Sequence, residues 1–469
     1  MNIVILGGGP AGVGAAWKLS RERDVNVVLV ERNEKLGGCA GSFEHKGHIL
    51  DFGSHRLHPA TAPEILDDVR SLLGDDLLDR PRHGRIRLGK GWLHFPLKPV
   101  DLLRHAGPRF LARIGRDVVT KPFRRSPAPG AAETFASVLA RNLGPTICED
   151  FYFPYARKIW GLPPEQLSAE QARRRVAAGS ISKLVRKVLS AVPGLKPPGA
   201  GRFFYPRGGF GSITEAYARA ARKAGAEIRT SSEVVALRPE GRGFVVTVES
   251  PSGREEIPAD AVWSTIPAAV LVRLLPDTPA EVLEAASRMR LRAMTLAYVE
   301  LTVDRFTEYD AHYFPGADLR MTRLSEPKNY GCRSKPAGRT VLCAEFPCTV
   351  GDEVWLASDE ELGRWVANDL ARVGLSLEGK VSGVWSARLP AAYPIYEDGF
   401  EDNVDRVDAH LLGKDGILSF GRQGLFAHDN THHTLAMAYA AVDCLENGSF
   451  DHARWEDYRR EFAGHVVED

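Results

Sequence analysis

Residues 1–12 read MNIVILGGGPAG, and this stretch decides how the chain begins to fold. Asn2 to Leu6 form a short apolar run rich in β-branched residues, which predicts a strand, and a helical pattern follows the glycines. A second apolar run, Val25 to Val30, ends at Glu31, which lies 19 residues beyond Gly12. Strand, GxGxxG, helix, strand and acid follow one another in the order that is typical of dinucleotide binding.

Each glycine of this pattern has a physical role in such a site. Gly7 permits the tight turn, Gly9 lets a pyrophosphate approach the backbone, and Gly12 lets helix and strand pack closely. The helix N-terminus offers free N–H groups to the phosphates, and Glu31 can accept a hydrogen bond from a ribose hydroxyl. The alternative is an ordinary glycine-rich turn between a strand and a helix.

Composition limits the classes of protein that this chain can belong to. Its 469 residues are enough for about three domain-sized units, and a formal net charge of +1 argues against a nucleic-acid partner. No run of 18 apolar residues exists, so we expect no transmembrane segment. The six cysteines are scattered without a CxxC pair, which predicts neither a zinc site nor a disulfide framework and favours a cytoplasmic location.

The residues after Glu31 carry a family resemblance. Arg32 is followed by Gly37 and Gly38 in the pattern E-R-x4-G-G-x3-S, and D-x-G-x-H follows at residues 51–55. This combination resembles the amine-oxidase-type flavoprotein superfamily. The resemblance implies an α/β fold, in which a Rossmann-like FAD-binding domain of amine-oxidase type carries an inserted α+β substrate domain. It also implies one non-covalently bound FAD.

Two later segments extend the resemblance. In such flavoproteins a strand at Val234 presents its backbone to the adenine, and a glycine turn at Gly421, with the helix that follows, faces the flavin. The cofactor-binding residues implied in this way are Gly7, Gly9, Gly12, Glu31, Arg32, Gly37, Gly38, Ser54, His55, Val234, Gly421, Arg422, Asn430 and Thr434.

The domain organisation that follows is discontinuous. We expect residues 1–75, 200–275 and 405–447 to form the FAD-binding domain, 76–199 and 276–404 the substrate-binding domain, and 448–469 a C-terminal tail. The first insert is mainly helical by periodicity, and the second alternates in two stretches that predict antiparallel strands, 295–303 and 341–346. Residues 183–195 form a candidate basic amphipathic helix, either a contact for a membrane surface or anionic ligand or a solvated helix face.

A narrower resemblance covers both inserts. Residues 153–163 read FPYARKIWGLP, and Arg175 ends a run of three arginines. Arg323 and Tyr393 lie in further short motifs that resemble the same family. Together these words resemble UDP-galactopyranose mutase, particularly its eukaryotic type, and some also occur in proteins resembling protoporphyrinogen oxidases. The substrate-binding residues implied are Tyr155, Lys158, Trp160, Arg175, Tyr313, Arg323, Asn329, Tyr330, Tyr393 and His428.

The mutase resemblance implies a mechanism. The N5 atom of reduced flavin attacks the anomeric carbon of a nucleotide-linked sugar, while Arg175 and Arg323 grip the diphosphate and His55 lies by the flavin. A guanidinium suits this task because its planar fork matches phosphate oxygens and keeps its charge. Arg175 follows two other arginines, so a charged surface run is the alternative, and a purely structural role is the alternative for His55.

Two features depart from the family pattern, and a third bears on whether the chain binds a metal. Ser54 stands where a glycine is usual, and Phe426 and His428 stand near the place of a tyrosine pair. His432 and His433 are adjacent, so their side chains point in different directions, and no carboxylate was recognised at metal-ligand spacing. The sequence therefore predicts no metal site.

Two functional hypotheses follow. The first is a flavoenzyme that acts on a nucleotide-linked sugar, a ring-contracting mutase or a close variant. The second is a redox flavoenzyme, an oxidase or dehydrogenase that uses the same fold to transfer hydride to FAD, because a fold alone does not choose the chemistry. NAD(P)H is a candidate external reductant. A non-catalytic flavin-binding protein is poorly supported, since the substrate segments retain Arg, Tyr and Asn residues.

Overall fold

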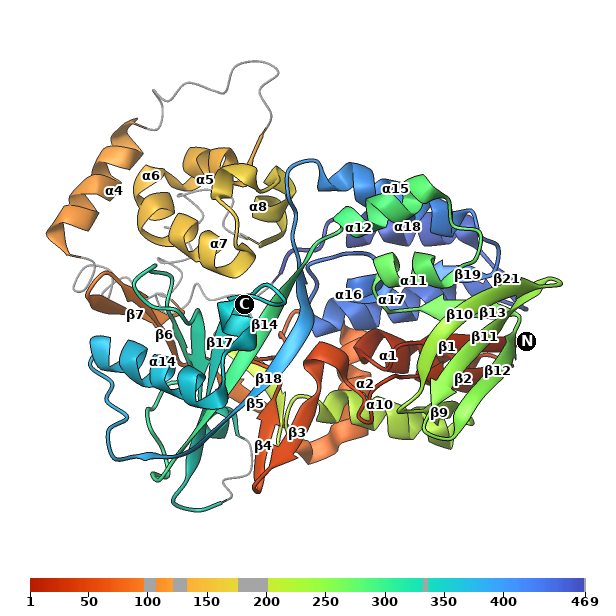
Figure 1. Cartoon of the computed structure of the whole chain (residues 1–469), viewed down its shortest axis with the longest axis horizontal. Coiled ribbons are helices and arrows are strands. Elements are labelled where there is room, and N and C mark those ends of the chain that lie inside the picture. Colours follow the sequence, from red (N-terminus) through yellow and green to blue (C-terminus); the bar gives the residue numbers. More distant parts are fainter. Residues whose placement is uncertain (97–106, 121–132, 176–200, 332–335, 468–469) are drawn as a thin grey trace.

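The computed structural model describes residues 1–96, 107–120, 133–175, 201–331 and 336–467. The predicted basic helix at 183–195 lies outside the described residues. Two lobes are visible, one built around the N-terminal strand and one that carries the inserted segments (Figure 1). Within the described ranges, none of the helices combines the length and the apolar character that a membrane span requires.

A five-stranded parallel sheet forms the centre of the first lobe. In spatial order its strands are β19 (Ile417–Ser419), β13 (Ala261–Ser264), β1 (Asn2–Leu6), β2 (Asn26–Val30) and β9 (Glu227–Arg229). The strands come from three stretches of chain that are far apart in the sequence. The sheet is therefore complete only when residues on both sides of the two inserted segments have come together.

Both faces of this sheet are buried, because alternate side chains of β1 enter different cores. Ile3 and Ile5 pack in a core with three helices, α1 (Pro10–Glu22), α10 (Ser212–Lys223) and α17 (Thr431–Asp443). Val4 and Leu6 face the opposite core. That core is covered by β10 (Glu233–Glu240), β11 (Gly243–Ser250), β12 (Gly253–Ala259), α11 (Ala268–Leu274), α12 (Ala280–Arg288) and α15 (Phe400–Leu412).

The second lobe contains a seven-stranded sheet in which every pair is antiparallel except β15 with β6. In spatial order its strands are β18 (Val381–Pro394), β14 (Leu291–Leu301), β17 (Thr340–Cys348), β16 (Arg323–Ser325), β15 (Ala311–Tyr313), β6 (Gly84–Leu88) and β7 (Gly91–Phe95). The predicted strands at 295–303 and 341–346 correspond to β14 and β17, which pair with each other, and α14 (Asp359–Arg372) packs against β14 and β18.

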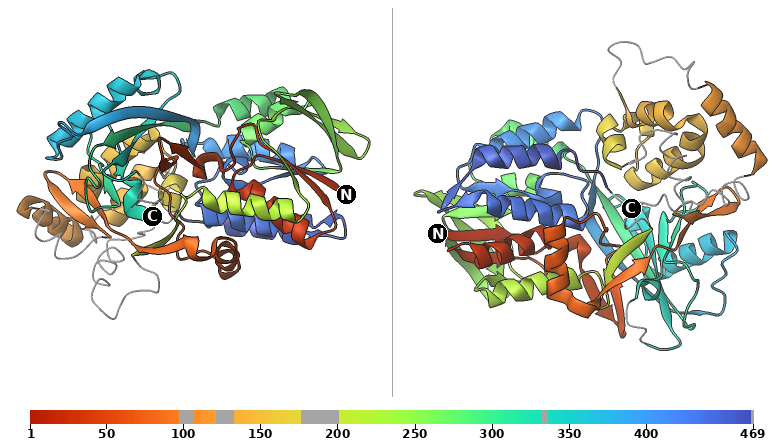
Figure 2. Two further views of the ribbon diagram at one scale, coloured as in Figure 1. Left: turned by 90° about the horizontal axis from the view of Figure 1, so that it is seen from below. Right: turned by 180° about the vertical axis from the view of Figure 1, so that it is seen from behind.

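Helices of the first insert form a separate cluster beside this sheet (Figures 1 and 2). They are α4 (Pro108–Thr120), α5 (Phe135–Leu143), α6 (Pro145–Ile147), α7 (Phe153–Trp160) and α8 (Ala169–Arg175). The helical prediction for this insert missed β5 (Leu77–Pro81), β6 and β7, which precede the helices. Each of these strands is only five residues long, so any alternation of apolar and polar residues is too short to give a clear signal.

The shorter elements connect the two lobes and complete the chain. β3 (Ser42–His45) and β4 (His48–Asp51) form a hairpin, and β5 pairs with β8 (Arg202–Pro206). The helix α2 (Pro63–Leu73) packs against α10 and α17 in the first lobe. The described part of the segment expected as a tail, residues 448–467, contains regular elements. It forms β21 (Ser449–Phe450), paired with β20 (Leu445–Glu446), and α18 (His452–Phe462), whose Trp455 and Phe462 are buried in the core of the parallel sheet.

Candidate active site

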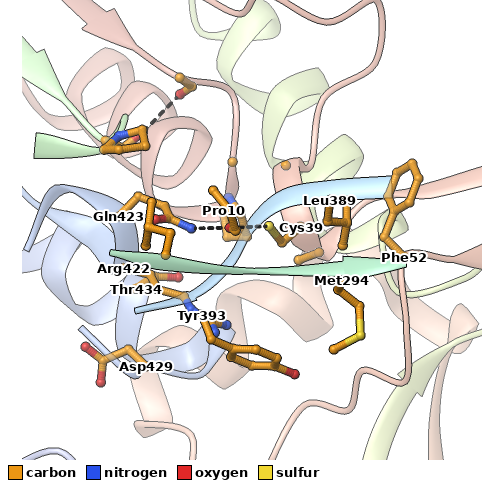
Figure 3. A pocket seen from close by; sticks show the side chains of 18 of the residues that line it. Pro10, Cys39, Phe52, Met294, Leu389, Tyr393, Arg422, Gln423, Asp429 and Thr434 are labelled. Carbon is orange, nitrogen blue, oxygen red and sulfur yellow. Dashed lines mark hydrogen bonds between the residues drawn. The ribbon is translucent and has the colours of Figure 1, made fainter. Parts of the chain in front are cut away.

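A cavity of about 1000 Å³ lies where the two lobes meet, and it takes its walls from both. Its size is at the upper end of the range for small-molecule sites. The carboxyl ends of β1, β2 and β13 and the start of α17 line one side, and β14, β16, β17 and β18 contribute to the other. Figure 3 shows side chains of both lobes that point into this space.

The glycine turn between β1 and α1 forms the first part of the wall. Gly7 has a φ of +99°, and a Cβ atom on Gly12 would stand 1.9 Å from the Gly7 carbonyl oxygen, so a side chain at position 12 would collide with the backbone. Gly9 is different, because a Cβ atom there would meet nothing within 4 Å and the residue lines the cavity. The open space at Gly9 lies beside the N-terminus of α1, as a pyrophosphate site requires.

Glu31 stands at the end of β2 with its carboxylate already held. Its Oε2 accepts a hydrogen bond from the Gly8 amide at 2.7 Å, and its Oε1 accepts from the amide and side-chain nitrogens of Asn33 at 2.9 and 2.7 Å. Glu31 and Arg32 both line the cavity. Oε1 already accepts two hydrogen bonds, but Oε2 accepts only one and retains a further lone pair, so the group can still accept from a ribose hydroxyl.

Gly37 and Gly38, the second glycine pair, have different places in the structure. Gly37 donates its amide to the Gly8 carbonyl at 2.9 Å and is not part of the cavity wall, whereas Gly38 lines the cavity. Next to Gly38, Cys39 contacts the carbonyl of Ala391 at 3.7 Å, and Gln423 donates to the same carbonyl at 2.8 Å from the other side (Figure 3). The end of β18 is thereby fixed against the cofactor lobe.

The remaining cofactor residues lie around the same space. Val234, Arg422, Asn430 and Thr434 line the cavity, and Arg422 donates to the Ala392 carbonyl at 2.8 Å. Gly421 is buried below, where a Cβ atom would stand 2.9 Å from that of Ala11. This cavity fits the phosphates and ribose of FAD. Gly9 and the N-termini of α1 and α17 suit the phosphates, and Glu31 suits the ribose.

The D-x-G-x-H segment positions His55 at the cavity. The Nε2 atom of His55 lies 2.9 Å from the Phe52 carbonyl, and its ring stacks on Phe210 with 5.4 Å between ring centres. Burial lowers the pKa of His55 and outweighs the neighbouring carboxylate of Asp51, so we expect a neutral imidazole near pH 7. Asp51 itself accepts from the hydroxyl of Tyr205 at 2.7 Å, which fixes the turn.

Arg323 lies opposite Glu345 in the register of β16 and β17. Its Nε donates to Glu345 Oε1 at 2.8 Å, and the same oxygen accepts from the Ser54 amide at 2.9 Å. Burial opposes the charge of Arg323, but the carboxylate of Glu345 outweighs it and raises the pKa of Arg323. Arg323, Glu345 and Ser54 all line the cavity, and Ser54 also contacts the Tyr330 hydroxyl.

Four arginines that line the cavity were not predicted from the sequence, namely Arg56, Arg82, Arg273 and Arg388. Arg56 and Arg82 each lie 3.5 Å from the Tyr313 hydroxyl, and Arg56 also donates to the Tyr330 hydroxyl at 3.2 Å. Arg56 follows His55 directly, so its place beside the motif is the signal that could have indicated it. Arg82 follows a short strand and carries no local signal.

Arg175 reaches the cavity at the end of α8, which argues against a role in a charged surface run. Its guanidinium carbon lies 5.4 Å from the ring centre of Tyr393, and that of Arg422 lies 5.0 Å from the same ring. Tyr393 therefore lies within cation–π distance of two cations. His428 lines the cavity beside them, with Nε2 3.0 Å from Gln171 Oε1; burial and the nearby arginines lower the pKa of His428 well below its ordinary value.

Tyr155 and Tyr313 also line the cavity, but four residues predicted to bind substrate do not. Lys158 donates from Nζ to the carbonyls of Phe314, Gly316 and Met321 at 2.6, 3.0 and 2.7 Å, and burial lowers the pKa of Lys158 to about 8. This ammonium holds a loop of the second insert, and a role of Lys158 in binding substrate stays a prediction.

The other three residues lie outside the cavity wall for similar physical reasons. Asn329 donates to the carbonyls of Thr307 and Tyr309 at 2.9 and 2.8 Å. Trp160 is buried in the core of the helical cluster. Tyr330 is 1% exposed and lies behind the wall, where it supports Ser54 and Arg56. These side chains build or support the wall and do not reach the space that a substrate would fill.

A cluster near the start of α17 corrects the argument that excluded a metal. Asp429 stands four residues before His433, and its Oδ1 lies 3.2 Å from the Nδ1 atom of that histidine. His465, from beyond α18, approaches the same oxygen at 3.1 Å. The spacing of Asp429 and His433 is visible in the sequence, whereas His465 is distant in the sequence and joins them only in the folded chain.

Comparisons with known proteins agree with this architecture. Residues 10–394 match the family described as flavin containing amine oxidoreductase. Protoporphyrinogen oxidase, chloroplastic, of Oryza sativa subsp. japonica is 24% identical over 98% of this chain and 89% of its own length. Protoporphyrinogen oxidase of Homo sapiens is 29% identical over 64% of this chain and 66% of its own. The crystal structure of reduced UDP-galactopyranose mutase is similar with a TM-score of 0.81 and 20% identity, and the match covers 100% of both chains.

Proposed function

Because this chain belongs to the flavin containing amine oxidoreductase family, and is therefore an FAD-dependent flavoenzyme, we propose that its substrate is a nucleotide-linked sugar. The proposed reaction is a mutase-type isomerisation of the sugar ring. The cavity supports this proposal because one continuous space contains both the dinucleotide features and a second wall rich in cationic side chains.

The observation that carries the proposal is the convergence of arginines on that second wall. Arg56, Arg82, Arg175 and Arg323 all line the cavity. Asp310 pairs with Arg56 at 3.4 Å and Glu345 pairs with Arg323, but within the described part of the chain no carboxylate pairs with Arg82 or Arg175. An excess of buried positive charge is costly unless an anionic ligand compensates it, and a diphosphate does so.

Side chains of this protein would divide the task of holding such a substrate. Arg175 and Arg323 present planar forks to the diphosphate oxygens, and Glu345 fixes the direction of the Arg323 fork. His55, neutral and hydrogen-bonded to backbone, contributes shape and a ring nitrogen instead of charge. When bound, FAD supplies either a nucleophilic N5 atom in its reduced form or a hydride acceptor in its oxidised form.

The second candidate is a redox reaction on an anionic substrate, in which hydride passes to FAD. It is favoured by the sequence relatives, which are named as protoporphyrinogen oxidases. The same arginines would then bind carboxylates of the substrate. NAD(P)H stays a candidate external reductant under the mutase proposal, which needs reduced FAD. The redox reaction itself reduces FAD and needs an oxidant, such as dioxygen, to regenerate it.

Anaerobic incubation of the enzyme with UDP-, GDP- and dTDP-sugars tests the choice. The mutase proposal expects that dithionite-reduced enzyme interconverts sugar ring forms without net consumption of reductant, and that oxidised enzyme is inactive. It also expects UDP to raise the melting temperature clearly. Turnover only in the oxidised state, with bleaching of the flavin, would overturn the mutase proposal in favour of the oxidoreductase.

A further inference from the structure

Three metal-ligating side chains come together at the edge of the cavity from separate parts of the chain. Asp429 stands two residues before α17 and lines the cavity, His433 is in the first turn of α17, and His465 follows α18. One ligand atom from each of the three residues lies within 4.8 Å of those of the other two. Figure 3 shows Asp429 at the margin of the pocket, beyond Tyr393.

The two oxygens of the Asp429 carboxylate have different surroundings. Both imidazoles approach the same oxygen, Oδ1, at 3.2 and 3.1 Å, while Oδ2 is buried and has no hydrogen-bond partner among the described residues. Charge-assisted hydrogen bonds are shorter, about 2.7–2.9 Å. Two ligands on one zinc ion with bonds of about 2.0–2.2 Å lie roughly 3.3–3.5 Å apart in a tetrahedron and nearer 2.9 Å at a right angle.

The two imidazoles are held as a pair beside that oxygen. The rings of His433 and His465 stack with 4.1 Å between ring centres, and the Nδ1 atom of each lies against Asp429 Oδ1. The backbone amide of Asn430 also points at His433 Nδ1 from 3.3 Å, which orients that ring. Two imidazole nitrogens and a buried carboxylate therefore converge from three separate segments.

We propose that Asp429, His433 and His465 form a binding site for a divalent transition metal, with zinc as the ion that fits best. Two imidazoles and one carboxylate are a ligand set that Zn²⁺ accepts, and a fourth position is left for water. The Asp429 side chain is 0% exposed, whereas those of His433 and His465 are 13% and 19% exposed. An ion can therefore enter from solvent and reach the buried carboxylate.

The site would join the end of the chain to the cavity wall. Val467 lines the cavity, and its amide donates to the Arg174 carbonyl at 2.8 Å, next to Arg175. His465, two residues earlier, holds this segment to Asp429. A metal bound there would stabilise residues 463–467 against α8 and so complete the wall beside Arg175.

Zinc titration of the tag-free, FAD-loaded enzyme tests this proposal after treatment with a chelator. Isothermal titration with ZnCl₂ alone should show one saturable site per chain with a dissociation constant below about 10 µM, and Co²⁺ should give absorption bands above 500 nm. His465→Ala should weaken zinc binding at least tenfold. His452→Ala, which removes an exposed histidine of α18, should bind zinc as the wild type does.

Hydrogen exchange and FAD content complete the design. Zinc should slow amide exchange in residues 463–467 of the wild type and not of His465→Ala, while the FAD content of both proteins stays equal, which shows that the variant is folded. Absence of saturable one-to-one binding in the wild type would overturn the proposal. Equal zinc affinity in the wild type and His465→Ala would overturn it too, and would leave Asp429 as a hydrogen-bonded anchor.

Discussion

The two walls of the cavity are constructed differently. The cofactor wall is largely backbone, because Gly9 and Gly38 expose main chain to the space and Glu31 is fixed by main-chain amides. The substrate wall consists of long side chains held by other side chains, as Arg323 is by Glu345. A backbone wall tolerates no added atoms, whereas a side-chain wall depends on charge and direction. Substitutions should therefore fail for different reasons on the two sides.

The largest effect is expected at the helix–strand contact of the cofactor wall. Gly12→Ala places a Cβ atom 1.9 Å from the Gly7 carbonyl oxygen, so the turn must open and FAD binding should be lost. Absorbance of the purified protein near 450 nm measures this. Gly115→Ala is the matched control, because a Cβ atom in that α4 position meets nothing within 4 Å. Equal flavin content in both variants would contradict the close-packed turn.

A second glycine sharpens the same point. Gly9→Ala adds a methyl group to open space at a φ of −74°, so the stability of the apoprotein should stay unchanged. FAD affinity should nevertheless fall, because the methyl group occupies the place where the pyrophosphate approaches the backbone. Thermal unfolding of the apoprotein and FAD titration separate the two effects. Unchanged FAD affinity would show that the phosphates bind elsewhere.

On the substrate wall we expect a smaller, charge-dependent loss. Arg323→Ala should weaken binding of UDP or the nucleotide sugar by roughly 2–5 kcal/mol if the arginine is a buried partner of the phosphate. Arg323→Lys keeps the charge but loses the planar fork, so it should also bind markedly more weakly. Titration calorimetry measures both. Arg320→Ala, in the preceding loop and 48% exposed, is the control and should bind as the wild type does.

Substitutions of Glu31, at the end of β2, measure how much a side chain of the cofactor wall contributes to FAD binding. Glu31→Ala should cost on the order of 1.5–3 kcal/mol of FAD binding, or roughly 10- to 150-fold in affinity. Glu31→Gln should cost less, because the amide oxygen can still accept from the Gly8 amide. FAD dissociation constants decide the matter. A change below twofold in Glu31→Ala would mean that Glu31 is not the ribose partner.

The smallest effect concerns acid stability of the inserted sheet. His312 is 2% exposed on β15, and burial, with Arg85 nearby, lowers the pKa of His312 to about 3. Between pH 6.5 and 3 the unfolded chain binds the extra proton, so this part of the stability is lost as pH falls. One unit below pH 6.5 the loss is about 1.4 kcal/mol.

His312→Phe removes this titration, so its melting temperature should fall less between pH 7.5 and pH 5.5 than that of the wild type. His452→Phe, on the exposed face of α18, should keep the pH dependence of the wild type. Differential scanning calorimetry at the two pH values gives the comparison. Parallel curves for all three proteins would show that His312 does not carry the effect.

The sequence could predict the cofactor wall because its signals are local. Gly7, Gly9 and Gly12 lie within six residues, and the spacing to Glu31 reflects one strand, one turn and one helix. The amine-oxidase resemblance then indicated the discontinuous sheet, and the alternating stretches indicated β14 and β17. Arg175, Tyr155, Tyr313, Arg323, Tyr393 and His428 were placed in the substrate site by family words, and all of them line the cavity.

The sequence could not predict the register of paired strands or contacts between residues that are far apart in the chain. Glu345 faces Arg323 only because β16 and β17 pair in one register, and no pattern within either strand fixes that pairing. Arg82 reaches the cavity through the pairing of β5 with β8, and His465 reaches Asp429 from the far end of the chain. Lys158 and Asn329 lie in motifs that resemble the family, yet their side chains donate to backbone carbonyls of loops. A motif therefore does not reveal whether a polar residue faces the cavity.

The order of chain segments in the parallel sheet has a consequence for synthesis. The helix α1 packs against α17, whose residues leave the ribosome more than 400 positions later, and β1 pairs with β13 only after residue 261. At about 5–20 residues per second the N-terminal strand waits on the order of ten seconds or longer with an unpaired apolar edge. During that interval the nascent chain is exposed to misassembly, so its yield in a cell should depend on chaperone capacity and translation speed.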